Sequence, residues 1–185
     1  MPIHGNSPPG VPRGTTILAV RHRGKTAMAG DGQVTLDAVV IKHGAKKVRR
    51  IYNGRIVVGI AGATADAMAL SERLESKLER HNGSLTRAAV ELAREWRTDK
   101  YLKRLEAMMI AADENLMYLI SGNGDVIEPD APVLAIGSGS VGARAAALAL
   151  IGHSDLDAEQ IAKAAMTIAA SICVYTNNEL TVEVL

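Results

Sequence analysis

The period of hydrophobic and polar positions changes several times along the chain, and each change marks a predicted element. Four β-rich runs come first, at residues 15–21, 25–31, 46–52 and 55–61. The last two are joined by Asn53-Gly54, and Asn-Gly is a strong signal for a hairpin turn. The pattern therefore predicts two β-hairpins in the first third of the chain.

From residue 63 the apolar positions recur every three or four residues, which is typical of amphipathic helices. The first helix is expected to end near residues 81–83, with a stripe formed by Ala67, Leu70, Leu74 and Leu78. Ser84 is expected to cap a second helix that runs towards residue 105, with a stripe formed by Leu85, Ala88, Leu92 and Trp96.

The second half repeats this order. Strands are predicted at residues 108–112, 117–121 and 133–136, helices at 142–150 and 158–173, and a closing strand at 180–185. Ser154 or Asp155 is expected to cap the last helix, whose predicted stripe is Ile161, Ala165, Ile168 and Ile172. Runs of strands that alternate with helix pairs predict an α+β fold, a four-layer α/β/β/α sandwich rather than a doubly wound sheet.

Composition limits the core and the class of protein. Hydrophobic residues make up 48% of the chain, but aromatic residues only 3%, and phenylalanine is absent. We expect a single domain at residues 15–185, with a core of closely packed aliphatic side chains. Residues 1–14 are rich in proline and glycine, and we interpret them as a disordered leader or propeptide.

The charges are nearly balanced, which argues against nucleic acid or a membrane surface as a partner. The formal net charge is +1, and the basic run at residues 46–50 lacks interleaved aromatic residues. A single cysteine, Cys173, cannot form an internal disulfide, and no apolar run is long enough to span a bilayer. We therefore expect a soluble, cytoplasmic protein.

Thr15, Asp31 and Lys47 form the first candidate for chemistry. A threonine at the start of a chain carries its own α-amine beside its hydroxyl, and that amine can act as a general base. A nearby Lys47 would lower the pKa of the amine by charge repulsion, and Asp31 would keep Lys47 charged and oriented. On spacing alone, a strand threonine, a turn aspartate and a solvated lysine explain the same residues.

A glycine pattern at residues 137–142 matches G-x-G-x-x-G between a strand and a helix, which is the context of a dinucleotide site. Too few residues follow for the second parallel strand and its acidic tip, so a tight turn explains these glycines better. Cys173 is expected to be a buried structural residue, and the five histidines show no metal-ligand spacing.

Seven ordered motifs then carry a resemblance to a known family. They are TTI at 15–17, AGDGQ at 29–33, KKVRR at 46–50, AGATAD at 61–66, EWRTD at 95–99, SGNGD at 121–125 and AIGSG at 135–139. In this order they resemble the HslV family of bacterial peptidase subunits, which are N-terminal nucleophile hydrolases related to proteasome β subunits. The resemblance extends from Thr15 to about Asn177.

The resemblance implies a threonine peptidase. Thr15 would be the nucleophile, released by cleavage of the Gly14–Thr15 bond, with Lys47 and Asp31 in the electrostatic roles described above. Ser138 is similar to a serine that forms a hydrogen bond near the threonine amine. The backbone N–H of Gly62 would stabilise the oxyanion.

The resemblance also implies a cation and partners. The backbone carbonyls of Ala170, Cys173 and Thr176 would hold a monovalent cation such as sodium, although members of the family often carry an acidic residue at the position of Ser171. Two stacked hexameric rings would receive unfolded proteins from an HslU-type hexameric AAA+ ATPase. No Walker A pattern occurs here, so we expect no nucleotide on this subunit. A ring-forming relative without activity is the alternative, and the presence of Thr15, Lys47 and Ser138 argues against it.

Overall fold

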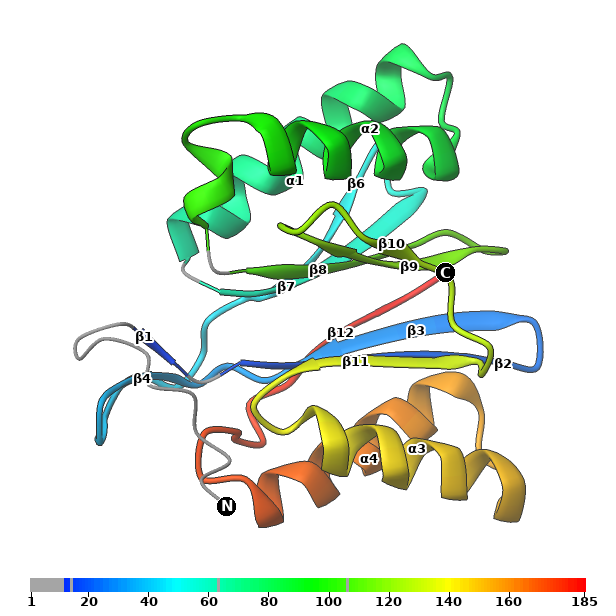
Figure 1. Cartoon of the computed structure of the whole chain (residues 1–185). Helices are drawn as coiled ribbons and strands as arrows, with labels where there is room; N and C mark the ends of the chain where they lie inside the picture. The colour runs from blue at the N-terminus through cyan, green and yellow to red at the C-terminus, as the bar shows by residue number, and fades with distance from the viewer. Residues whose placement is uncertain (1–11, 14, 63, 106) are drawn as a thin grey trace.

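A computed structural model describes residues 12–13, 15–62, 64–105 and 107–185. Two β-sheets lie face to face, and a pair of helices covers the outer face of each sheet (Figure 1). The predicted four-layer α/β/β/α architecture is therefore confirmed. Residues 1–11 and Gly14 lie outside the described residues, so the structure does not test most of the predicted leader.

One sheet has five antiparallel strands in the order β10-β9-β8-β7-β6. Its strands are β6 (Val48–Ile51), β7 (Ile56–Ala61), β8 (Met108–Ala112), β9 (Met117–Ser121) and β10 (Val126–Ile127). Every residue of β7 is buried, as expected for a strand covered on both faces. Lys47 lies one residue before β6, at the end of the sheet that carries the candidate site.

The other sheet has four antiparallel strands in the order β11-β2-β3-β12. Its strands are β2 (Thr16–His22), β3 (Lys25–Gly30), β11 (Val133–Gly137) and β12 (Thr181–Val184). Arg23 and Gly24 form the β2–β3 turn with φ of 51° and 75°, as a two-residue hairpin with a primed turn requires. The register of β11 places Gly137 opposite Thr16.

Helices α1 (Thr64–Arg80) and α2 (Leu85–Thr98) cover the five-stranded sheet, and α3 (Ser140–His153) and α4 (Ala158–Ile172) cover the other. The predicted stripes of the first two helices are confirmed, because their leucines and Trp96 are fully buried. Lys77, which is 5% exposed, joins α1 to α2 through ion pairs with Glu91 and Glu95.

Three details of the helices were predicted wrongly. The second helix stops at Thr98 rather than running towards residue 105. A short 3-10 helix, η1 (Leu102–Arg104), follows it. Asp157 caps α4 and exchanges hydrogen bonds with Gln160, so neither Ser154 nor Asp155 is the cap. The predicted α4 stripe is wrong in its second half, because alanines and Met166 face the sheet and leave Ile168 and Ile172 exposed.

A third, small sheet is absent from the prediction. It contains β1 (Pro12–Arg13), β4 (Val34–Leu36) and β5 (Val39–Lys42) in the order β1-β4-β5. We expected no regular element before Thr15, but β1 pairs with β4, and proline is tolerated at the edge of a sheet. All four residues of β5 are exposed, so no alternation of buried positions marked the hairpin in the sequence.

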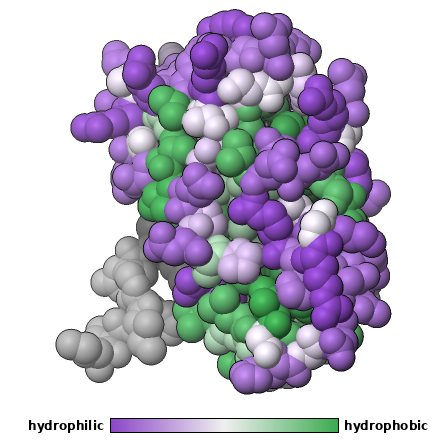
Figure 2. Space-filling view, turned by 90° about the vertical axis from the view of Figure 1, so that its right-hand side faces the viewer, coloured by the Kyte–Doolittle hydropathy of each residue, from purple (hydrophilic) through white to green (hydrophobic). Residues whose placement is uncertain are grey.

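Small residues let the two sheets approach closely. A Cβ added at Gly59 would lie 2.5 Å from Ile17 in the opposite sheet, so no side chain fits at position 59 unless its neighbours shift. On the face shown in Figure 2, hydrophobic residues gather at the level of α3 and α4, whereas the level of α1 and α2 is mostly hydrophilic. No helix in the described part of the chain is long and apolar enough to cross a membrane.

Candidate active site

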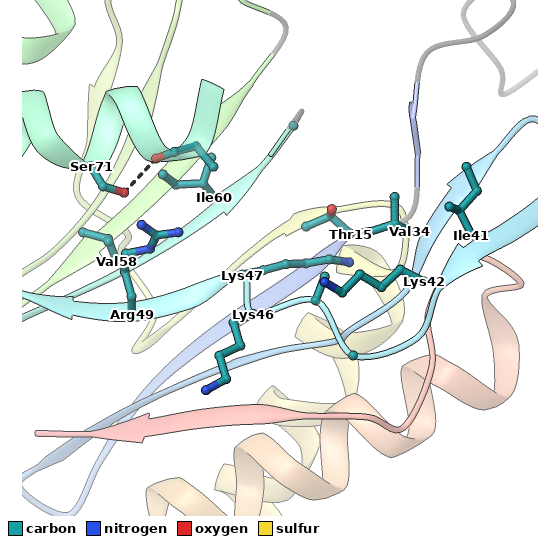
Figure 3. Close-up of a pocket in the computed structure, with 14 residues that line it drawn as sticks. Thr15, Val34, Ile41, Lys42, Lys46, Lys47, Arg49, Val58, Ile60 and Ser71 are labelled. Carbon is teal, nitrogen blue, oxygen red and sulfur yellow. Dashed lines mark hydrogen bonds between the residues drawn. The ribbon is translucent and has the colours of Figure 1, made fainter. Parts of the chain in front are cut away.

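Thr15 lies directly before β2 and lines a cleft of about 550 Å³ (Figure 3). The cleft lies beside the ends of β6 and β7 and the start of α1, and it receives the predicted residues Lys47 and Gly62 as well. Its floor is mostly apolar, formed by Val34, Ile41, Ala45, Val58, Ile60 and Ala67. The structure thus brings three of the five predicted catalytic residues to one hollow.

The neighbouring Thr16 is committed to structural hydrogen bonds. It is fully buried, its Oγ1 lies 2.7 Å from Oγ1 of Thr176, and it accepts a hydrogen bond of 2.9 Å from the Gly139 N–H. Thr15 is only partly buried and lies on the wall of the cleft. Of the two adjacent threonines, Thr15 is the one whose position suits attack on a bound substrate.

Asp31 organises the residues behind the cleft. It is fully buried, and its Oδ1 accepts hydrogen bonds from the Thr16 N–H at 2.7 Å and from Lys47 Nζ at 3.0 Å. Its Oδ2 accepts the Gln33 N–H at 3.0 Å. A buried carboxylate needs such partners, and these tie the peptide bond after Thr15 to the lysine beside it.

Lys47 lines the cleft, and its burial disfavours the charged form of its side chain. Its Nζ also donates a hydrogen bond of 2.5 Å to the Gln33 carbonyl, and 9% of its side chain is exposed. Burial lowers the pKa of Lys47 below the 10.5 of a free lysine, and the opposing attraction of Asp31 offsets only part of this shift. Because Lys47 and the Thr16 N–H share one oxygen of Asp31, this ammonium is fixed close to Thr15.

Ser138 meets Thr15 through the backbone. Its N–H donates a hydrogen bond of 2.8 Å to the Thr15 carbonyl, and its own side chain is exposed. The preceding Gly137 has φ of +90°, and a Cβ there would lie 1.9 Å from the Thr15 carbonyl oxygen. Glycine is therefore required at 137 so that β11 can approach Thr15 this closely.

Gly139 and Thr176 are site residues whose structural contacts the sequence did not reveal. A Cβ at Gly139 would lie 2.7 Å from the hydroxyl oxygens of both Thr16 and Thr176. These contacts join β2 to segments more than 120 residues away, so no local spacing could indicate them. The motif AIGSG was the available signal, because glycines that flank a serine at a strand end mark close backbone approach.

Gly62 lies between β7 and α1 and lines the cleft together with Thr15. Its φ of +152° is a conformation that side-chain-bearing residues rarely adopt. The residue that follows, Ala63, lies outside the described residues. Gly62 therefore lies at a turn from strand to helix, on the same cleft as Thr15.

The predicted cation segment, residues 170–176, begins in the last turn of α4. Cys173, which is half-buried, ends the helix, so it is not the buried helix residue that we expected. Its N–H binds the Ala169 carbonyl, and its own carbonyl accepts the Thr176 N–H at 3.1 Å. No three His, Cys, Asp or Glu side chains gather as metal ligands anywhere in the described ranges, so side chains offer no such site there.

The glycines at 137–142 do not form a dinucleotide site. The strand before them, β11, pairs antiparallel with β2, and β12 pairs antiparallel with β3, so the parallel βαβ unit is missing. Gly137 and Gly139 instead give room to Thr15, Thr16 and Thr176. The alternative of a dinucleotide-binding domain is therefore wrong.

Comparisons with known proteins show which family this chain resembles. A family model described as proteasome subunit matches residues 11–185. The ATP-dependent protease subunit HslV of Sulfurihydrogenibium sp. (strain YO3AOP1) is 61% identical over 171 residues, which cover 92% of this chain and 96% of that protein. The subunit of the same name from Aquifex aeolicus (strain VF5) is 58% identical over 171 residues, covering 92% of this chain and 97% of that protein.

Among solved structures, the crystal structure of eukaryotic HslV from Trypanosoma brucei superimposes with a TM-score of 0.88 at 50% sequence identity. The alignment covers 92% of this chain and 98% of that one. The family model, the sequence identities and the fold all indicate the same family. This chain belongs to the proteasome subunit family, among the HslV subunits of ATP-dependent proteases.

Proposed function

We propose that the chain is a threonine-type endopeptidase in which Thr15 is the nucleophile. The observation that supports this most is the difference in surroundings between two adjacent threonines. Thr15 lines the cleft beside Lys47, whereas the hydroxyl of Thr16 is buried and already bonded. Of these two threonines, only Thr15 can therefore present its hydroxyl to a peptide in the cleft.

The chemistry follows from the groups around Thr15. Its free α-amine removes the proton from Oγ1, which attacks the carbonyl carbon of the scissile bond. Lys47 keeps the pKa of that amine low, so that the amine is unprotonated near neutral pH. The N–H of Gly62 stabilises the oxyanion, the amine returns the proton to the leaving nitrogen, and water then hydrolyses the ester on Thr15.

Maturation is part of the proposal. Within the full chain the nitrogen of Thr15 belongs to a peptide bond with Gly14 and cannot act as a base, so the bond must be cut before turnover. The hydroxyl of Thr15 can attack this preceding carbonyl, and the resulting ester is hydrolysed by water. Gly14 lies outside the described residues. Because glycine has no side chain, it would not hinder the attack of the Thr15 hydroxyl on its carbonyl.

We also propose a monovalent cation, sodium, held by the backbone carbonyls of Ala170, Cys173 and Thr176. The last carbonyls of a helix lack partners within the helix and carry the negative end of its dipole, and Ala170 lies in the last turn of α4. Carbonyl oxygens are hard ligands that suit such an ion. Bound there, the cation would fix the segment that holds Thr176 against Thr16.

The proposed assembly is two stacked hexameric rings, fed with unfolded proteins by an HslU-type hexameric AAA+ ATPase in the cytoplasm. Exposed apolar side chains support contacts between copies. Val141 is 83% exposed and Ile172 71%, and Gly142, next to Val141, lies against Ile172. Burial of such residues against another subunit would remove them from water.

The proposal is tested with variants of Thr15. Thr15→Ala is expected to lower peptide hydrolysis on the order of 10⁴-fold or more, because the nucleophile is lost, and to leave the number of subunits in the oligomer unchanged by light scattering. Thr15→Ser keeps a hydroxyl and an amine and should retain measurable hydrolysis. A peptide epoxyketone should label Thr15 in the wild type. Labelling of Thr15→Ser is compatible with the proposal but is not required by it. Hydrolysis by Thr15→Ala at the wild-type rate would refute the assignment, and failure to label a fully assembled wild type would favour the inactive ring-forming relative.

A further inference from the structure

Gln33 carries a buried amide side chain that the proposed chemistry does not use. It lies two residues after Asp31 and directly before β4, and it is only 5% exposed. Residues 31–33 belong to no helix or strand, so side-chain contacts contribute to fixing the backbone there. A buried amide costs free energy unless it forms hydrogen bonds, so the partners of Gln33 indicate what it holds in place.

Both protons of the Gln33 amide are used. Its Nε2 donates a hydrogen bond of 3.0 Å to Oγ1 of Thr35 in β4 and one of 2.9 Å to the carbonyl of Val174, in the segment after α4. An amide nitrogen carries two protons, so these two acceptors use its whole capacity as a donor. The side chain therefore joins the small third sheet to a segment that lies 141 residues further along the chain.

The backbone of the same residue contacts the charged pair beside Thr15. The Gln33 N–H donates a hydrogen bond of 3.0 Å to Oδ2 of Asp31, and its carbonyl accepts one of 2.5 Å from Nζ of Lys47. Because Lys47 Nζ also bonds to Oδ1 of Asp31, the three residues form a closed ring of hydrogen bonds. The position of the ammonium therefore depends on where the Gln33 carbonyl lies.

We propose that Gln33 is a positioning residue: its side chain anchors its own peptide to Thr35 and Val174, so that its carbonyl holds the Lys47 ammonium beside Thr15. This inference rests on the proposed function of Thr15 and Lys47. It makes the segment after α4 part of the charge arrangement at the site. A displacement of the Val174 carbonyl would move Gln33, and with it an acceptor of the lysine.

The test measures the rate constant for labelling of Thr15 by a peptide epoxyketone across pH, with the partner ATPase and a slowly hydrolysed ATP analogue present. Each rate constant is divided by the fraction of chains that begin at Thr15, which intact mass gives. The proposed mechanism needs Lys47 protonated, so the rate declines as the pH rises through the pKa of Lys47. The other charged residues that line the cleft stay unchanged in every variant of residue 33, namely Lys42, Lys46 and Arg49.

Gln33→Met keeps the length of the side chain but removes both N–H groups. A carbonyl that is no longer held stabilises the ammonium less, so the alkaline decline should move to lower pH by about one unit. The maximal rate constant should fall by about tenfold, because Lys47 is less well placed. Circular dichroism shows whether the variant folds.

Gln33→Glu keeps the shape of the side chain and decides the question if the methionine variant does not fold. Its ionised carboxylate cannot donate to Val174, so the maximal rate constant should fall as well. The added negative charge favours the ammonium, so the alkaline decline should move to higher pH, opposite to Gln33→Met. A general loosening of the fold would not reverse the direction.

Gln160→Met is the matched control. It makes the same substitution in the other glutamine of the chain, which is exposed and does not line the cleft. The alkaline decline should stay at the pH of the wild type in this variant. An equal shift in Gln160→Met would overturn the inference, because the effect would then not depend on the contacts of residue 33.

An alkaline decline at the wild-type pH in Gln33→Met would also overturn the inference, whatever the maximal rate constant. A shift in the same direction in Gln33→Met and Gln33→Glu would do the same. The proposed function fails separately, if the wild type hydrolyses peptides without being labelled at Thr15, or if Lys47→Arg leaves the alkaline decline where it was. Labelling of the wild type and of Lys47→Arg therefore distinguishes the two failures.

Discussion

At the scale of single residues, one buried carboxylate holds most of the site together. Asp31 accepts three backbone N–H groups and the Lys47 ammonium, and hydrogen bonds to a charged group are worth about 1.5–3 kcal/mol each. Their combined effect is comparable to the several kcal/mol that burial of a carboxylate costs. The net result is therefore positioning rather than stability: the Thr15–Thr16 peptide and Lys47 are held on one atom.

The lowered pKa of Lys47 leads to a prediction about pH. The mechanism needs Lys47 protonated, so activity is present below its pKa and is lost as the pH rises through it. Because burial lowers this pKa below 10.5, the alkaline decline should begin below the pH at which a free lysine titrates. The pH profile of the rate of Thr15 labelling by an epoxyketone, measured on processed protein, gives this limb directly.

Lys47→Arg supplies the comparison for that profile. A guanidinium stays protonated throughout the accessible range, so the alkaline limb should move to higher pH even if the maximal rate falls because the shape differs. Circular dichroism across the same range shows whether the fold persists. An alkaline limb at the same pH in Lys47→Arg would mean that another group controls it.

Thr15, Asp31 and Lys47 could be identified from the sequence because their motifs and their chemistry pointed to the same residues. The structure brings them together as expected. Gly139 and the Thr16–Thr176 contact could not be identified, because they depend on close approach between distant segments. A sequence pattern reports spacing along the chain, whereas these contacts depend on how the sheets and α4 are packed.

At the scale of elements, periodicity succeeded where an element has one buried face and failed where it has none or several. The leucine stripe of α1 and the Leu-Trp stripe of α2 alternate with charged residues and were found. In α4 ten of the fifteen residues are alanine or another apolar residue, so several stripes fit the sequence, and burial alone shows which faces the sheet. The β4–β5 hairpin was missed because β5 is exposed throughout.

The C-terminal end of α4 carries the prediction about the cation. Replacement of sodium by tetramethylammonium, which is too large for a carbonyl site, should slow Thr15 labelling by about tenfold, because loss of the ion would loosen the segment that holds Thr176 against Thr16. Return of sodium at constant ionic strength should restore the rate. Labelling that is equally fast in both salts would show that the loop needs no such ion.

At the scale of the whole molecule, the two sheets place the start of β2, and with it Thr15, at the cleft. Pro12–Arg13 pairs with β4, so these two residues of the proposed leader belong to the small third sheet. Val34 in β4 also lines the cleft, so the same small sheet contributes to the substrate site. Release of the leader would therefore free both the amine of Thr15 and the edge of β4.

The central claim is that the amine of Thr15 is the base, and this requires a chain that begins at Thr15. Intact mass spectrometry of the purified peptidase, taken from the sample whose hydrolysis rate is measured, tests it most directly. We predict that the active protein has the mass of residues 15–185 and that Thr15→Ala keeps residues 1–14. A sample that hydrolyses peptides at full rate while every chain still carries its leader would contradict the account.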